Sequence, residues 1–221
     1  MNSVKIFIDF DDVIFNTKRF KADFEKIFFQ FGITADIFRK NYYNYSPNKE
    51  LFSAKTYFLE KHLAMIRKCK VFNKPKLKKS IQAFLGDAQK YVFSDVEMFL
   101  QKFSPKELFL ISHGDRNFQR KKIENTRLKK YFCVIKISSG QKSKDICPQI
   151  KKIKERKFFL DDRVHYLEEV KRCLPEIVTI LIQRSEGRYQ DQKNHYCDFT
   201  AKNLKEALKI IKNYTARCVP Q

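Results

Sequence analysis

The sequence predicts an α/β protein with a doubly wound parallel sheet and an inserted helical cap. Over residues 91–221, short apolar runs alternate with segments of helical periodicity, a pattern typical of parallel strands covered by helices on both faces. Residues 34–90 have helical periodicity and no strand-like alternation. We therefore expect an α/β core built from residues 1–15 and 91–221, and a helical cap built from residues 16–90.

The N-terminal elements follow from two clear patterns. Residues 4–9 form a β-branched and aromatic run that ends in carboxylates, as expected of a buried strand whose carboxyl end lies at a site. Residues 18–31 predict a helix, because Gly32 stands where a left-handed cap belongs and apolar residues recur at helical spacing: Phe20, Phe24, Ile27, Phe28 and Phe31.

The C-terminal half predicts four further strands, at residues 107–112, 133–137, 157–160 and 177–182. Helices are expected between and after them, at residues 118–130, 144–153, 164–173 and 204–211. A helix at residues 94–103 precedes them, and Ser94 with Glu97 has the spacing of a capping box at its start.

The composition indicates a globular protein with a strongly basic surface. The 221 residues carry a formal charge of +21, and residues 16–90 hold 17 Lys or Arg against 6 Asp or Glu, a net +11. Such a charge attracts polyanions, so nucleic acid is one possible partner. The alternative is a solvated surface in a chain that is rich in lysine throughout.

Other classes of protein are disfavoured. No apolar run approaches the ~18 residues of a spanning helix, and the N-terminus does not resemble a signal peptide, so we expect a cytoplasmic protein without a membrane partner. The six cysteines lack CxxC or zinc-type spacing, so we expect reduced thiols.

Carboxylates and a hydroxyl follow three of the predicted strands. Asp9, Asp11 and Asp12 come after the first strand, Ser112 ends the second, and Asp161 with Asp162 ends the strand at residues 157–160. Clustered carboxylates repel one another, and a hard divalent cation such as Mg²⁺ relieves that repulsion. An acidic loop in solvent is the alternative for the first cluster taken alone.

In this order the set resembles the four motifs of the haloacid dehalogenase (HAD) superfamily, over essentially the whole chain. The first motif is Asp9-Phe10-Asp11-Asp12-Val13, the second is the strand ending in Ser112, the third is a lone lysine, and the fourth is Leu160-Asp161-Asp162. The stretch at residues 92–132 is similar to the capped phosphatase branch, whose members carry a helical cap of the C1 type.

The resemblance implies roles for individual residues. Asp9 would be the nucleophile and Asp11 the general acid and base, which requires a raised pKa for Asp11. Ser112 and a lysine would bind the phosphoryl group; Lys142 is preferred and Lys144 is the reserve. His113 either lines the mouth of the site or is an ordinary loop residue.

The resemblance also implies a Mg²⁺ site. The ligands would be a carboxylate oxygen of Asp9, the backbone carbonyl of Asp11 and a carboxylate of Asp162, with Asp161 acting through water. One departure concerns Tyr166, which stands where many family members have a further acidic residue; Glu168 is a weak substitute.

The implied activity is Mg²⁺-dependent hydrolysis of a phosphorylated small molecule or nucleotide through an aspartyl-phosphate. Dehalogenases of the family lack the second aspartate of the first motif, so Asp11 favours phosphate transfer to water. Three alternatives stay open: a phosphomutase, a nucleic-acid end phosphatase or polyanion-binding protein that uses the basic cap, and an inactive interaction module.

Overall fold

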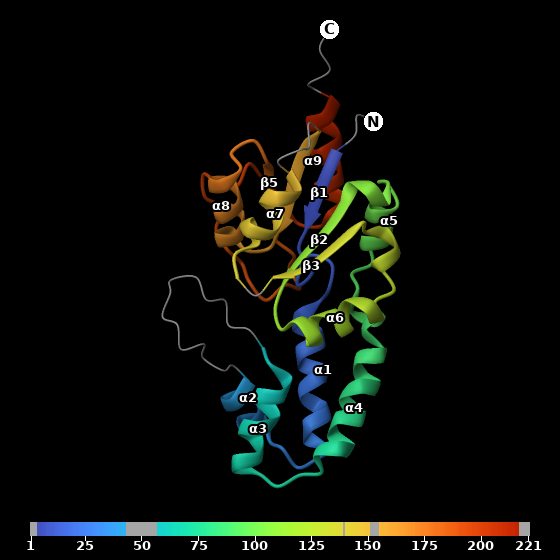
Figure 1. Cartoon of the computed structure of the whole chain (residues 1–221), viewed down its shortest axis with the longest axis vertical. Helices are drawn as coiled ribbons and strands as arrows, with labels where there is room; N and C mark the ends of the chain where they lie inside the picture. The colour runs from blue at the N-terminus through green and yellow to red at the C-terminus, as the bar shows by residue number, and fades with distance from the viewer. Residues whose placement is uncertain (1–3, 43–56, 139, 151–154, 217–221) are drawn as a thin grey trace.

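The computed structural model describes residues 4–42, 57–138, 140–150 and 155–216. Within this part of the chain a twisted sheet is sandwiched between helices, and a group of helices extends from one end of the sheet (Figure 1). We call the described part of residues 16–90 the helical lobe.

The sheet contains six parallel strands in the described residues. They run in the order β3-β2-β1-β4-β5-β6. Their bounds are β1 Val4–Ile8, β2 Leu108–His113, β3 Val134–Ser138, β4 Arg156–Asp161, β5 Val178–Ile182 and β6 Phe199–Ala201. The chain moves outward from β1 to β2 and β3, then returns to β4 on the other side of β1. The reversal of direction places a topological switch point between β1 and β4.

Successive side chains of the buried strands alternate between the two faces of the sheet. Phe7, Phe109 and Phe159 pack on the side covered by α7 (Lys142–Ile150) and α8 (Val164–Cys173). Ile6, Leu108 and Phe158 pack on the opposite side. That side is covered by α5 (Val96–Leu100), α6 (Arg116–Asn125) and α9 (Leu204–Ala216). The doubly wound α/β fold expected from the sequence is confirmed.

The helical lobe contains four described α-helices: α1 Thr17–Phe29, α2 Ala35–Tyr42, α3 Leu59–Cys69 and α4 Lys74–Gly86. A 3₁₀ turn, η1 (Ala88–Tyr91), leads back to the sheet. The Asn16 and Asn73 side chains accept hydrogen bonds that cap α1 and α4, and Gly32 after α1 has the positive φ of 68° that its position predicted.

Aromatic rings form the interior of the helical lobe and join it to the sheet. Phe24 is fully buried and lies 5.2–6.0 Å from neighbouring rings of α1, α2, α4 and α6. Phe118 of α6 is one of these neighbours, and it also lies 5.0 Å from Tyr57. Burying a phenylalanine contributes roughly 1.5–3 kcal/mol, so α6 is a strong apolar link between the two parts.

The chain enters and leaves the helical lobe through two backbone segments that lie side by side, around residues 14–16 and 91–93. Phe15 forms an antiparallel bridge with Val92. Asn16 N donates to Tyr91 O at 2.8 Å, and Phe93 N donates to Ile14 O at 3.0 Å. The two crossings are therefore hydrogen-bonded to each other at the point where the lobe begins.

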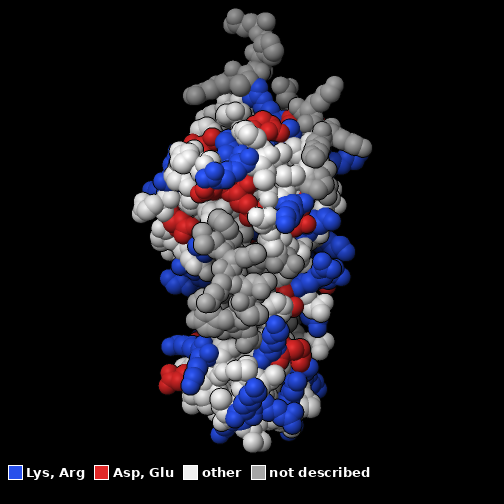
Figure 2. All heavy atoms as spheres, turned by 60° about the vertical axis from the view of Figure 1, so that its left-hand side comes forward, with Lys and Arg blue, Asp and Glu red and all other residues white. Residues whose placement is uncertain are grey.

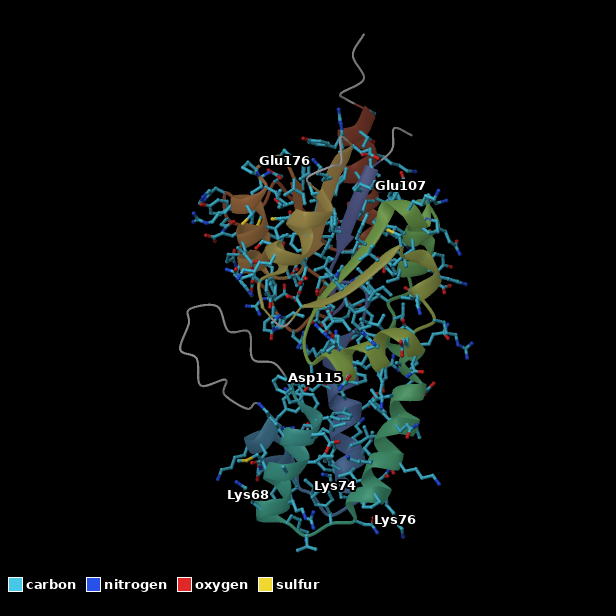
Figure 3. The ribbon with its side chains drawn as sticks, viewed as in Figure 1. Lys68, Lys74, Lys76, Glu107, Asp115 and Glu176 are labelled. Atoms are coloured by element: carbon cyan, nitrogen blue, oxygen red, sulfur yellow. The ribbon has the colours of Figure 1, made fainter. Side chains whose placement is uncertain are left out.

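The carboxyl ends of the strands face the helical lobe. Figure 3 shows Asp115, which follows β2, between the sheet and the lobe, whereas Glu107 and Glu176, which precede β2 and β5, lie at the far end of the sheet. Lys74 and Lys76 lie at the distal end of the lobe. Because the strands are parallel, the carboxyl ends of β1, β2 and β4 lie at this same edge of the sheet, on the side of the helical lobe.

Most predicted elements are confirmed, with three differences. The predicted capping box at Ser94 is wrong: α5 begins after Asp95 without a side-chain cap, and the box forms instead at the short 3₁₀ turn η2 (Pro105–Glu107), where Ser104 N donates to Glu107 Oε2 at 2.8 Å. The strand β6 was not predicted, because three residues carry too little alternation. The helix predicted at residues 118–130 is α6, which ends at Asn125, and a separate 3₁₀ turn, η3 (Lys129–Tyr131), follows it.

The expected reduced thiols agree with the structure where it describes them. Five cysteines form no disulfide bond within the described residues, and Cys218 lies outside them. Every helix in the described part of the chain is too short or too polar to cross a lipid bilayer.

Candidate active site

Three strands deliver the predicted site residues to one edge of the sheet. Ile8 at the end of β1 is in register with Leu110 of β2 on one side and Leu160 of β4 on the other. Asp9 continues past the end of β1, and its N–H donates to Leu160 O at 2.9 Å. Asp9 therefore lies between the ends of β2 and β4, where ligands bind in open α/β sheets.

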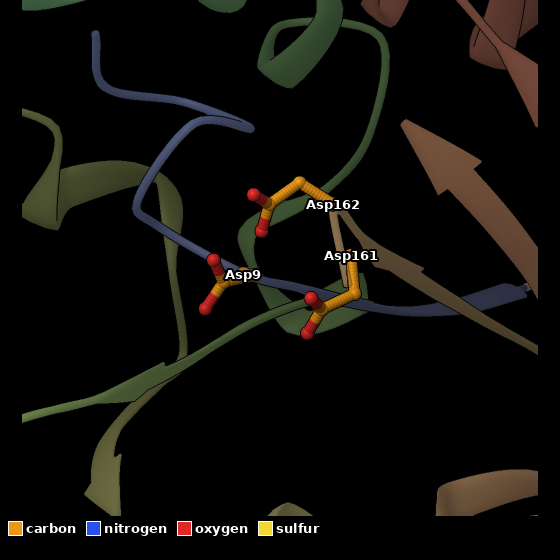
Figure 4. A group of neighbouring side chains, drawn as sticks. All are labelled: Asp9, Asp161 and Asp162. Carbon is orange, nitrogen blue, oxygen red and sulfur yellow. The ribbon is translucent and has the colours of Figure 1, made fainter. Parts of the chain in front are cut away.

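Asp9, Asp161 and Asp162 form a compact group of carboxylates at this edge (Figure 4). One carboxylate oxygen from each residue lies within 4.8 Å of the others, and all three residues are buried. Three buried carboxylates at this separation repel one another strongly unless cations or protons neutralise them.

One cation between two of these carboxylates is Lys142, the first residue of α7. Its Nζ lies 2.6 Å from Asp9 Oδ1 and 2.6 Å from Asp161 Oδ2, and only 1% of its side chain is exposed. The ammonium also lies 4.2 Å from the centre of the Tyr166 ring. Burial would lower the pKa of Lys142, but Asp161 and Asp9 outweigh it and raise the pKa above its usual value, so Lys142 stays charged.

Asp11 lies in a separate hydrogen-bonded group. Its Oδ1 accepts from Lys122 Nζ and from Thr17 Oγ1, both at 2.6 Å, and its Oδ2 accepts from Gln119 Nε2 at 2.6 Å. The same Gln119 amide donates to Ser112 Oγ at 2.7 Å. Gln119 thereby connects the predicted phosphate-binding hydroxyl to the predicted acid and base.

The ionisation of Asp11 differs from the expectation. Burial would raise its pKa, but Lys122 and then Arg188 outweigh burial and lower the pKa to about 2. The two cations come from α6 and from the loop after β5, far from Asp11 in the sequence, whereas the expected rise in pKa depended on the neighbouring carboxylates. In this arrangement Asp11 is a carboxylate at neutral pH.

The pKa values of Asp9 and Asp162 are raised, in contrast to that of Asp11. Burial raises the pKa of Asp9 to about 7 against the opposing charge of Lys142. Burial, and then the charges of Asp161 and Asp9, raise the pKa of Asp162 well above its usual range. Asp162 Oδ2 is buried and has no hydrogen-bond partner among the described residues.

This arrangement fits a divalent cation. Within the described site, three cations pair with four of the carboxylates: Lys142 with Asp9 and Asp161, Lys122 with Asp11, and Arg188 with Asp12. The fifth carboxylate, Asp162, has no such partner. When all five carboxylates are ionised, their five negative charges exceed the three positive charges by two, and one Mg²⁺ ion in place of the protons on Asp9 and Asp162 would neutralise this excess; carboxylate oxygens are its preferred protein ligands.

Comparison with known proteins identifies the fold. No family model and no curated protein sequence matches the chain. Among solved structures, a haloacid dehalogenase-like protein from Burkholderia xenovorans superposes with a TM-score of 0.68 at 16% identity, over 97% of this chain and 99% of that one. The chain has the haloacid dehalogenase-like fold.

Other proteins with the HAD fold differ in what they act on or bind. YfnB from Bacillus subtilis, a HAD-type protein solved with bound magnesium, has a TM-score of 0.64 at 13% identity, over 96% of this chain and 99% of that one. The L-2-haloacid dehalogenase of Xanthobacter autotrophicus has a TM-score of 0.63 at 11% identity, with the same coverage. At these identities the comparisons establish the HAD fold alone.

The structure also places the other residues predicted for the site, which are Lys144, His113 and Glu168. Lys144 is exposed on α7, whereas Lys142 is in contact with Asp9. His113, at the end of β2, is partly buried with its ring 5.9 Å from that of Tyr166, and burial, followed by the charge of Lys142, lowers its pKa. Glu168 pairs with Arg172 at 2.8 Å and is engaged away from the group of carboxylates.

Four residues at the site were not predicted from the sequence: Gln119, Lys122, Arg188 and Thr17. A signal existed for the first two. In α6, Lys122 stands three residues after Gln119 and four after Phe118, so the helical period places it on the buried face, where a lysine requires a partner. Arg188 lies in an irregular loop, and no local pattern connects it with Asp12.

Proposed function

We propose that this protein is a Mg²⁺-dependent phosphohydrolase of the HAD type that attacks phosphorus with Asp9. The observation that carries the proposal is the convergence of Asp9 with the unpaired carboxylate of Asp162 beside the buried ammonium of Lys142. By the family resemblance, HAD dehalogenases have no aspartate at the position of Asp11. Its presence here favours a phosphate ester over a halogenated acid as substrate.

In this proposal a carboxylate oxygen of Asp9, a carboxylate oxygen of Asp162 and the backbone carbonyl of Asp11 hold the metal. Mg²⁺ when bound would neutralise phosphate oxygens and orient the phosphoryl group. Lys142, held by Asp161, provides positive charge beside the nucleophile, and Ser112 provides a hydroxyl. His113 lies at the end of β2 next to Ser112 and would contact the bound phosphate from there.

The first chemical step forms a bond between Asp9 and phosphorus and breaks the bond from phosphorus to the leaving oxygen. The leaving oxygen takes a proton from Asp11. Because Asp11 is paired with Lys122 and has a pKa of about 2, it must first gain that proton. A phosphate dianion placed beside Asp11 raises its pKa and so favours this protonation.

In the second step, Asp11 as a carboxylate takes a proton from water, and the water oxygen attacks phosphorus and releases Asp9. Gln119 holds both Asp11 and Ser112 during this exchange, through hydrogen bonds of 2.6 and 2.7 Å. The helical lobe covers the carboxyl edge of the sheet and would act as the cap that limits access of bulk water.

A direct experiment tests the proposal. Phosphate release is measured from phosphorylated metabolites, nucleotides and 4-nitrophenyl phosphate, with Mg²⁺ or with EDTA, for wild type and for Asp9→Asn. We expect release that requires Mg²⁺ and is lost in Asp9→Asn. Halide release from 2-chloropropionate in place of phosphate release would contradict the proposal and favour a dehalogenase.

A second candidate is a phosphatase that acts at the ends of nucleic acids. It rests on the basic surface of the helical lobe, where Lys68, Lys76 and Lys79 are exposed on α3 and α4 (Figure 2 shows basic side chains over the lobe as well as over the sheet). Oligonucleotides with a 5′- or 3′-phosphate are therefore included in the screen. A steep decline of their cleavage with salt, absent for small esters, would favour this candidate.

A further inference from the structure

The loop at residues 183–191, which follows β5, is folded back onto the loop that follows β1. Gly187 N and the Gln190 side chain both donate to Arg184 O at 3.0 Å. A Cβ at position 187 would lie 3.1 Å from that oxygen, so glycine suits the tight turn. The turn places the next residue, Arg188, against Asp12, which directly follows the predicted acid and base.

The guanidinium of Arg188 has donors that are not used within the described part of the protein. Its Nε donates to Asp12 Oδ2 at 2.5 Å. Neither Nη nitrogen has a hydrogen-bond acceptor among the described residues. Asp12 itself has a φ of 59° and is 1% exposed, so this ion pair fixes one side of the guanidinium and leaves the other side available.

The three cations of the site differ in depth. The exposed fraction of the side chain is 1% for Lys142, 4% for Lys122 and 27% for Arg188. Lys142 lies beside Asp9, where phosphorus would be attacked, so the deep end of the site takes the transferred phosphoryl group. The remainder of the substrate must then lie toward the exposed end, where Arg188 is found.

An aromatic side chain, Tyr189, lies beside Arg188 at this end of the site. Tyr189 is partly exposed, and the guanidinium of Arg163 lies 3.8 Å from the centre of its ring, with that of Arg188 at 5.0 Å. Arg163 directly follows Asp162 in the chain. The guanidinium of Arg163 is itself paired with Asp191 at 3.0 Å, so the Tyr189 ring and the outer edge of Arg188 form the part of this rim that is suited to planar or anionic groups of a substrate.

We infer that Arg188 binds a second anionic group of the substrate, carried by the leaving group. The substrates are therefore phosphate esters that bear a further phosphate or a carboxylate. This inference rests on the proposed function and deepens it. Arginine is suited to the role, because its planar fork can hold Asp12 on one edge and an oxyanion on the other.

The kinetic test compares three esters that share one reacting group: propane-1,3-diol monophosphate, its bisphosphate, and 3-phosphooxypropanoate. For wild type we expect a lower KM for the two esters with a second anion. Arg188→Gln should raise those KM values roughly tenfold to a hundredfold, because it removes a charged hydrogen bond, and should leave the KM of the monophosphate within about threefold. Whichever of the two esters responds identifies the second anion.

Matched variants separate substrate binding from support of Asp12. Arg172→Gln, an exposed arginine on α8, should behave as wild type. If Arg188 only neutralises Asp12, the double variant Asp12→Asn/Arg188→Gln should recover wild-type KM values, and the inference is then wrong. If Arg188 binds substrate, the double variant keeps the raised KM for the doubly anionic esters, and Arg188→Lys recovers part of the affinity.

A binding experiment decides the inference even if no ester is hydrolysed. Calorimetry with the Asp9→Asn protein and Mg²⁺ compares pyrophosphate with orthophosphate. We expect pyrophosphate to bind at least tenfold more tightly, and Arg188→Gln to remove that preference. Equal affinity for both anions, or a preference that survives Arg188→Gln, would overturn the inference. Absence of turnover with this preference intact would instead count against the proposed hydrolysis alone.

Discussion

The ammonium of Lys122 lies 2.6 Å from Oδ1 of Asp11, and both side chains are largely buried. The same ammonium lies 4.8 Å from the centre of the Phe15 ring and 5.2 Å from that of Phe20. Lys122 thus joins the loop after β1 to the start of α1 and to α6. Its charge explains why Asp11 is ionised in a site where its neighbours Asp9 and Asp162 tend to be protonated.

Lys122→Met should destabilise the protein, because it leaves a buried carboxylate without its partner. We expect a loss of about 3 kcal/mol in the free energy of unfolding, measured by urea denaturation at pH 7. Lys121→Met, at the exposed adjacent position, is the control and should change stability by less than about 0.5 kcal/mol. Equal effects of the two substitutions would show that the ion pair contributes little.

The contribution of Asp9 to the stability of the metal-free protein should fall as the pH rises from about 4 to about 7, opposite in direction to that of His62, whose pKa is lowered by burial to about 4. The pKa of Asp9 is about 7 in the folded protein against 3.8 for the free side chain, so the folded state binds more protons than the unfolded state over this interval. Thermal unfolding in EDTA across this pH range measures the trend. In Asp9→Asn the decline should be reduced.

Magnesium should stabilise the protein more at pH 8 than at pH 5.5. Binding requires the carboxylates of Asp9 and Asp162 in their charged form, and the raised pKa values mean that protons compete with the metal at the lower pH. The shift of Tm on addition of Mg²⁺ measures the effect. A shift that is independent of pH would argue against direct ligation by these residues.

Asp162→Asn should stabilise the metal-free protein and abolish its response to Mg²⁺. The substitution removes a buried carboxylate whose Oδ2 has no partner, and it removes a proposed ligand. We expect Tm in EDTA to rise by a few degrees, which corresponds to roughly 1 kcal/mol. Asp87→Asn, at an exposed position, is the control and should retain the wild-type response.

Phe24→Ala should destabilise the helical lobe by about 4 kcal/mol, because it opens a cavity among the packed rings of four helices. Phe29→Ala, on the same helix at a position that is 45% exposed, should cost less than about 1 kcal/mol. Chemical denaturation monitored by circular dichroism compares the two. Similar losses would mean that the aromatic cluster adds little beyond helix formation.

The fold could be predicted from the sequence because its signals are local. Alternation of short apolar runs with helical periods predicted five of the six described strands in their succession along the chain, and the α8 helix was predicted with its observed bounds, Val164–Cys173. The carboxylates after β1 and β4 could be predicted to lie close together because the carboxyl ends of parallel strands meet at the same edge of a sheet. The capping box at Ser94 was wrong because the backbone turns into α5 one residue later.

The electrostatics of the site could not be predicted in the same way. The pKa of Asp11 depends on Lys122 and Arg188, which lie 111 and 177 residues further along the chain and reach it only in the folded protein. Sequence spacing identifies which groups can meet at a strand end. It does not reveal the cations that approach from a helix face or from a loop.

The position of β1 between β2 and β4 has a consequence for synthesis. Asp9 is translated some 150 residues before Asp161 and Asp162, and β1 cannot complete its pairing until β4 has emerged from the ribosome. A nascent chain that stops before β4 therefore leaves one edge of β1 unpaired and lacks two carboxylates of the candidate site. The site would form only when β4 joins the sheet across this long sequence separation.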